Sequence, residues 1–116
     1  MMIHGGAWTI GTSTHLPPDQ ITHLLAHNFI IVSPEYRLAP HAKLLDSVED
    51  LLDAYRWVLK DLRRELGMPL RREEDERVCL MGWSAGGTGS LLLVSEGSSF
   101  LIRIGALQQP ADEIRW

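Results

Sequence analysis

The strongest constraint on how this chain folds is a short glycine-rich segment, Gly82-Trp83-Ser84-Ala85-Gly86-Gly87, set between two apolar segments. Residues 78–81 before it are apolar and predict a buried strand, whereas residues 85–94 predict a helix. A strand that turns directly into a helix forces the turn residue into a strained conformation, and flanking glycines let the two backbones come close. We therefore expect the Ser84 hydroxyl to project from the edge of a sheet, at the amino end of a helix.

The rest of the chain alternates strand-like and helix-like patterns, which is typical of a parallel sheet with helices packed on it. The helix at 48–66 has the clearest pattern, because its apolar residues recur at steps of three and four. The complete set of predicted strands is 1–3, 29–32, 78–81 and 100–104, and that of helices is 17–28, 48–66 and 85–94. We expect an α/β fold, with a parallel sheet of three to four strands and flanking helices, in a single domain covering residues 1–116.

Composition excludes several classes of function. The chain has 11 Lys and Arg against 15 Asp and Glu, so its charge of -4 provides no field that would attract nucleic acid or anionic lipid. No apolar run reaches the roughly 18 residues of a membrane helix, so we expect no stable membrane insertion. Cys79 has no disulfide partner, and His23 and His27 have no third ligand for zinc. We expect a cytoplasmic protein with no metal and no organic cofactor.

A second glycine-rich segment, His4-Gly5-Gly6-Ala7-Trp8, ends the first predicted strand. In acyl transfer the substrate carbonyl oxygen becomes an anion, and backbone N–H groups in a glycine-rich turn can stabilise it without interference from side chains. Taken alone, this segment is also explained by an ordinary tight turn, and Ser84 by a serine in a glycine-rich loop. Together, the two segments favour nucleophilic attack on a carbonyl group.

These motifs occur in the order HGGAW, SPEYRLAP at residues 33–40, a helix rich in Asp and Leu, and GWSAGG. In that order, over residues 3–94, the chain resembles the hormone-sensitive-lipase-like branch of the α/β-hydrolase superfamily, which contains carboxylesterases and lipases. The resemblance implies a partial α/β-hydrolase fold, with a nucleophile elbow that carries Ser84 as the catalytic serine. The oxyanion hole that it implies consists of the backbone N–H groups of Gly5, Gly6, Ala7 and Ala85.

The resemblance also implies supporting roles. The residues expected to support the loop and the elbow are His4, Gly82, Gly86 and Gly87. Tyr36 and Arg37 match positions that brace the loop after the strand, and we interpret both, and Glu35 beside them, as structural. Two residues depart from the family pattern: Ala7 stands where a third glycine is usual, and Glu35 where an aspartate is usual. Ala7 keeps its backbone donor only if it can adopt the conformation that the loop requires.

A catalytic base does not follow the serine. In α/β-hydrolases the order is Ser, then Asp or Glu, then His, but the histidines of this chain all precede Ser84. Asp112 and Glu113 come later, yet they have no imidazole to orient. We therefore expect a truncated piece of a hydrolase domain, lacking N-terminal strands and the C-terminal acid and histidine region. Its exposed sheet edges predict self-association.

The leading interpretation is a serine hydrolase of carboxylesterase or lipase type, which acts on small-molecule carboxylic esters through a Ser84 acyl-enzyme and is weak or inactive in this chain. Amide bonds are open to the same chemistry. The alternative is a non-catalytic hydrolase remnant that binds an acyl ligand or a protein partner. A third interpretation takes residues 82–89 as a phosphate cradle, but the lysine of a P-loop is absent.

Overall fold

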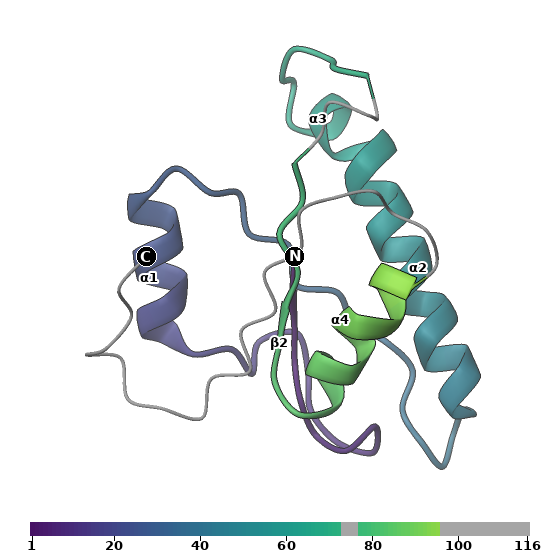
Figure 1. Ribbon diagram of the computed structural model, residues 1–116. Helices are drawn as coiled ribbons and strands as arrows, with labels where there is room; N and C mark the ends of the chain where they lie inside the picture. Colours follow the sequence, from purple (N-terminus) through teal and green to yellow (C-terminus); the bar gives the residue numbers. More distant parts are fainter. Residues whose placement is uncertain (73–76, 96–116) are drawn as a thin grey trace.

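The fold is a small parallel sheet with helices on both sides (Figure 1). The computed structural model describes residues 1–72 and 77–95. The elements in chain order are β1 (Met2–Ile3), α1 (Pro18–Ala26), α2 (Leu44–Lys60), α3 (Leu62–Glu65), β2 (Met81–Gly82) and α4 (Ala85–Ser95). Strands β1 and β2 pair in parallel, and α1 lies on the opposite side of them from α2 and α4. The α/β class with flanking helices is confirmed.

Helix α2 forms where the apolar periodicity predicted it, although its bounds differ. One face buries Leu51, Tyr55 and Val58, while charged residues occupy the exposed face. The helix begins earlier than predicted because the Asp46 carboxylate accepts a hydrogen bond from the Lys43 N–H, at 2.8 Å, which satisfies a free donor in the first turn. After a break between α2 and α3, Gly67 adopts a φ of 62°, which ends the helical segment.

The core lies between the two strands and helices α2 and α4. It is formed mainly by aliphatic side chains, together with two buried tyrosines. Its buried members are Met1, Ile3, Tyr36, Leu51, Tyr55, Val58, Leu80 and Leu93. Helix α4 approaches both strands through its glycines: a Cβ atom on Gly86 would overlap the Ile3 carbonyl, and one on Gly82 would overlap the Gly86 carbonyl. The glycines of this segment therefore set the distance between helix and sheet.

The segment at residues 29–32 differs from the prediction. It was expected to be a strand covered on both faces, but it has no strand conformation and makes one backbone hydrogen bond to β1, from the Met2 N–H to the Val32 carbonyl at 2.8 Å. Phe29 and Ile30 are 49% and 48% exposed. Helix α1 buries none of its residues and leaves these side chains uncovered. The described part of the sheet therefore has two strands, and the strand predicted at 100–104 lies outside the described residues.

Candidate active site

Ser84 occupies a strained turn between β2 and α4. Its φ is 51°, in the left-handed region that residues with a side chain seldom adopt. The turn continues into the helix through hydrogen bonds from the Gly86 N–H to the Trp83 carbonyl (2.9 Å) and from the Thr88 N–H to the Ser84 carbonyl (3.1 Å). Ser84 is exposed, and its hydroxyl makes no hydrogen bond within the described residues. The serine thus stands at the surface, as the glycine spacing predicted.

The loop after β1 also depends on left-handed backbone conformations. Gly6, Ala7 and Trp8 have φ values of 122°, 51° and 63°. The Gly6 carbonyl accepts hydrogen bonds from the Thr9 and Ile10 N–H groups, both at 3.0 Å, which closes the turn. A Cβ atom on Gly6 would overlap the Ile10 carbonyl, so that position requires glycine. Ala7 adopts the conformation that its place in the loop demands, at the energetic cost of a left-handed alanine.

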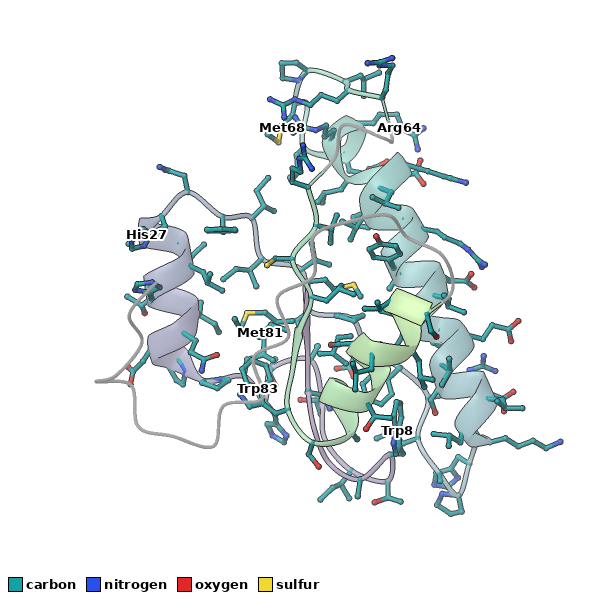
Figure 2. All side chains as sticks on the ribbon, viewed as in Figure 1. Trp8, His27, Arg64, Met68, Met81 and Trp83 are labelled. Carbon is teal, nitrogen blue, oxygen red and sulfur yellow. The ribbon has the colours of Figure 1, made fainter. Side chains whose placement is uncertain are left out.

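The two glycine-rich segments lie against each other. Parallel pairing puts the carboxyl ends of β1 and β2 at the same edge, where the loop and the elbow begin (Figure 1). A Cβ atom on Gly5 would lie 2.8 Å from the Trp83 carbonyl oxygen and 3.5 Å from the Ser84 Cβ. Trp8 and Trp83, one from each segment, lie at the same end of the molecule in Figure 2. The sequence prediction that brought these segments together agrees with this geometry.

Several backbone donors at this edge are free. The N–H groups of Gly5, Gly6, Ala7 and Ala85 donate no hydrogen bond to any other described residue. Unpaired N–H groups at a helix start and in a glycine turn attract negative charge. An exposed hydroxyl and free donors therefore share one edge of the sheet.

The buried side chain of His4 supports the loop at residues 5–8. Its side chain is fully buried, its Nδ1–H donates to the Gly5 carbonyl at 2.8 Å, and its ring stacks on Tyr36 with centroids 4.3 Å apart. The Tyr36 hydroxyl donates to the His4 carbonyl at 2.8 Å, and burial raises the pKa of that phenol. Trp8 packs edge-on against Tyr36 at 5.5 Å. The position of Tyr36 agrees with the bracing role that its motif suggested, whereas sequence reasoning missed the contribution of Trp8.

A second connection ties the segment after residue 33 to α2. The Arg37 side chain donates to both oxygens of Asp50, at 2.7 Å from Nη2 and 2.8 Å from Nε, and the Arg37 N–H donates to the same carboxylate at 2.9 Å. These hydrogen bonds lower the pKa of Asp50. The Trp8 carbonyl accepts a hydrogen bond from the Ala39 N–H at 2.8 Å, which joins this segment to the loop. Asp50 was not singled out from sequence because it is one of several acidic residues on α2.

Within the described residues, no histidine or carboxylate forms a hydrogen bond with the Ser84 hydroxyl. His4 is buried and its Nδ1 is occupied by the Gly5 carbonyl, while the other histidines are exposed. Among residues 1–72 and 77–95, no three side chains of the kind that bind metal ions form a group. In the same part of the chain, no helix has both the length and the apolar character needed to cross a bilayer. Asp112 and Glu113 lie outside the described residues.

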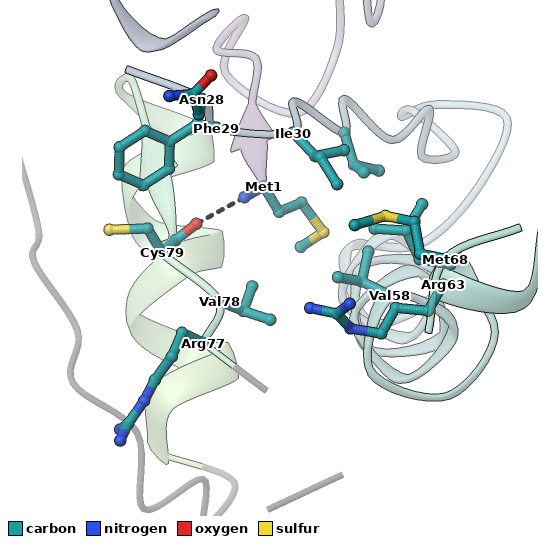
Figure 3. Close-up of a pocket in the computed structure, with 12 residues that line it drawn as sticks. Met1, Asn28, Phe29, Ile30, Val58, Arg63, Met68, Arg77, Val78 and Cys79 are labelled. Carbon is teal, nitrogen blue, oxygen red and sulfur yellow. Dashed lines mark hydrogen bonds between the residues drawn. The ribbon is translucent and has the colours of Figure 1, made fainter. Parts of the chain in front are cut away.

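A cavity of about 260 Å³ lies at the opposite edge of the sheet (Figure 3). Apolar side chains line it, including Met1, Phe29, Ile30 and Val78, together with Arg63 and Arg77. The amino group of Met1 donates to the Cys79 carbonyl at 2.6 Å, and burial lowers the pKa of this group from 8.0 to about 6. Met1 and Cys79 precede the two strands and Ser84 follows β2, so this cavity is not part of the serine site.

Comparison with known proteins places the chain in a family. Residues 1–111 match a family model described as alpha/beta hydrolase fold. The chain therefore belongs to the α/β-hydrolase fold family, which confirms the resemblance drawn from its motifs. It is 36% identical over 88 residues to the non-reducing polyketide synthase Preu6 of Preussia isomera, an alignment that covers 75% of this chain and 4% of that protein.

Solved structures agree with this assignment. The Francisella virulence factor BioJ aligns with a TM-score of 0.64 and 29% identity, covering 82% of this chain and 30% of that one. A bacterial heroin esterase aligns with a TM-score of 0.59 and 27% identity, covering 89% of this chain and 32% of that one. The chain thus spans a small part of the polyketide synthase and about a third of these structures. Family membership and the heroin esterase among the solved neighbours support a hydrolase.

Proposed function

We propose that this chain carries the nucleophile and the oxyanion hole of a carboxylic ester hydrolase of carboxylesterase or lipase type. The observation that carries the proposal is the exposed Ser84 hydroxyl, held at a φ of 51° beside free N–H groups from two separate segments. The donors would be the N–H groups of Gly5, Gly6, Ala7 and Ala85. A heroin esterase among the structural neighbours supports an ester as substrate.

In the proposed reaction, the Ser84 oxygen attacks the carbonyl carbon of the ester while its proton leaves to a base. The carbonyl oxygen becomes an anion that the free N–H groups stabilise, and expulsion of the alcohol, which takes up a proton, leaves an acyl-serine. Water then attacks the acyl-serine and releases the carboxylic acid and the serine. Removal of a single oxyanion donor in such sites costs about 2.7–4 kcal/mol of transition-state stabilisation.

The rate of this reaction depends on a base that accepts the Ser84 proton. No histidine follows Ser84 in the chain, and His4 is engaged with Gly5. With water as the acceptor of the serine proton, the rate enhancement would come from the oxyanion donors and substrate binding, which act even without a complete triad. We propose weak hydrolysis by this chain. The second candidate is a non-catalytic hydrolase remnant that binds an acyl ligand or a protein partner, and the lack of a hydrogen bond from Ser84 to a histidine in the described residues favours it.

The two candidates differ in their dependence on the serine. Hydrolysis of p-nitrophenyl butyrate by the purified chain should fall to the buffer rate in Ser84→Ala if Ser84 is the nucleophile. Ser95→Ala is the matched control, because Ser95 is also exposed on α4 and its hydroxyl donates only to the Leu92 carbonyl. Control activity should equal that of the native chain. Equal rates in the native and Ser84→Ala chains would exclude the ester hydrolase and leave the binding role.

A further inference from the structure

One ring nitrogen of His4 makes no hydrogen bond within the described residues. Because the Nδ1–H donates to the Gly5 carbonyl, the neutral ring carries its lone pair on Nε2. The Nε2 atom is buried and makes no hydrogen bond within the described residues. An unsatisfied buried polar atom destabilises the fold, and this one lies directly below the loop with the free N–H groups. A group that forms a hydrogen bond or an ion pair with Nε2 would therefore stabilise the loop.

That group is the carboxylate of Glu35. Its Oε2 lies 3.9 Å from the His4 Nε2, within ion-pair range but beyond hydrogen-bond length. Its Oε1 accepts hydrogen bonds from the Ser13 N–H at 2.8 Å and from the Ser13 hydroxyl at 2.7 Å, so the carboxylate is held in place. The Ser33 hydroxyl in turn donates to the Ser13 carbonyl at 2.7 Å. The Nε2 atom and the carboxylate thus face each other at ion-pair distance with no hydrogen bond between them.

We propose that Glu35 is a positioning residue for the loop, whose carboxylate receives the N–H of His4 Nε2 whenever that nitrogen is protonated. The resulting ion pair anchors the His4 ring and, through it, the turn at Gly5 and Gly6. Without the proton, the two acceptors repel each other and the turn is held less firmly. The link from this turn to ester hydrolysis rests on the proposed function, whereas the pairing itself does not.

The charge states of the other titratable groups around the pair decide how a pH test of the pair must be designed. The hydrogen bonds from Ser13 keep the pKa of Glu35 below its ordinary 4.5, so the carboxylate is ionised at both pH 5 and pH 8. Burial and the Glu35 charge raise the pKa of Tyr36, which stays neutral over this range. His15 acts on Glu35 electrostatically, and histidines ordinarily change charge between these two pH values. A test must therefore separate His4 from His15.

The first test compares thermal unfolding of the native chain and Glu35→Gln at pH 5 and pH 8. The glutamine oxygen can still accept from Ser13, and its amide can donate to an unprotonated Nε2. We expect the Tm of the variant to be about 5 °C lower than that of the native chain at pH 5, and equal or higher at pH 8. Glu49→Gln, which removes an exposed carboxylate from α2, should show the same small shift at both pH values. An equal Tm deficit of Glu35→Gln at both pH values would overturn the proposal.

A second test needs no Glu35 variant and so holds even where Glu35→Gln does not fold. The ¹³C signal of the Glu35 carboxylate and the ¹⁵N signal of the His4 Nε2 are followed by NMR through the pH range in which His4 gains its proton. We expect both to shift together, and to do so again in His15→Asn. A carboxylate signal that stays constant while His4 gains its proton, or that stops moving in His15→Asn, would overturn the pairing.

Neither test measures hydrolysis. Loss of the Ser84-dependent rate would therefore refute the ester hydrolase and leave the pair of His4 and Glu35 to be judged on its own signals. Conversely, a pH-independent Tm difference would refute the role of Glu35 and leave the serine chemistry untouched.

Discussion

The two edges of the small sheet are built differently. At the edge that carries Ser84, backbone contacts are close: Gly86 packs against the Ile3 carbonyl, and Gly5 against the Trp83 carbonyl. At the opposite edge, Phe29 and Ile30 are about half exposed beside a cavity of about 260 Å³. The Ser84 edge, which we call the close edge, is held by backbone contacts at the ends of the strands. The opposite edge, which we call the open edge, could be covered only by other elements packing on its apolar side chains. The described residues leave these side chains partly exposed.

The largest expected effect tests the close edge. Gly86→Ala would put a methyl group into the backbone carbonyls of Ile3 and His4, so the helix or the strand must move. We expect a loss of about 3 kcal/mol or more in the free energy of unfolding, measured by urea denaturation.

Gly87→Ala is the matched control for this variant. The nearest atom to its added Cβ is the Gly82 carbonyl oxygen at 3.4 Å, and alanine favours a helix by about 0.5–1 kcal/mol over glycine. This control should be neutral or slightly stabilised. If both variants had the same stability, close backbone packing would not hold this edge.

An intermediate effect tests the open edge. If its exposed apolar side chains drive self-association, Ile30→Lys should raise the dissociation constant of the associated chain about tenfold, which corresponds to about 1.4 kcal/mol. Sedimentation velocity over a concentration series measures this constant. Leu45→Lys, at a position 77% exposed on α2, should leave the constant unchanged. A native chain that is monomeric at every concentration would contradict self-association at this edge.

The smallest effect returns to the loop at the close edge. Ala7 has a φ of 51°, which costs alanine about 1–2 kcal/mol and glycine almost nothing. Because glycine also gains entropy in the unfolded chain, Ala7→Gly should stabilise the fold by only about 0.5–1 kcal/mol, seen as a small rise in Tm. Ala54→Gly, inside α2, should instead destabilise by about 1 kcal/mol. A loss of stability in both variants would show that Ala7 is not strained.

The close edge could be predicted from the sequence because its conformation follows from local sterics. Glycines on both sides of Ser84 after an apolar run leave few backbone paths, and the turn that resulted has the expected strained serine. The same reasoning located α2, whose apolar residues recur at helical spacing. Residues 29–32 could not be read in this way, because an apolar run becomes a covered strand only when other elements pack on both of its faces.

Contacts between residues far apart in the sequence could not be predicted from local sequence patterns either. Nothing near Glu35 in the sequence indicates that its carboxylate faces His4, or that Trp8 packs on Tyr36. Short-range sterics and apolar spacing encode which turns and helices form, since they act between residues a few positions apart. Contacts between distant residues depend on the paths of all the intervening elements, and three-dimensional packing alone brought His4 and Glu35 together beneath the loop.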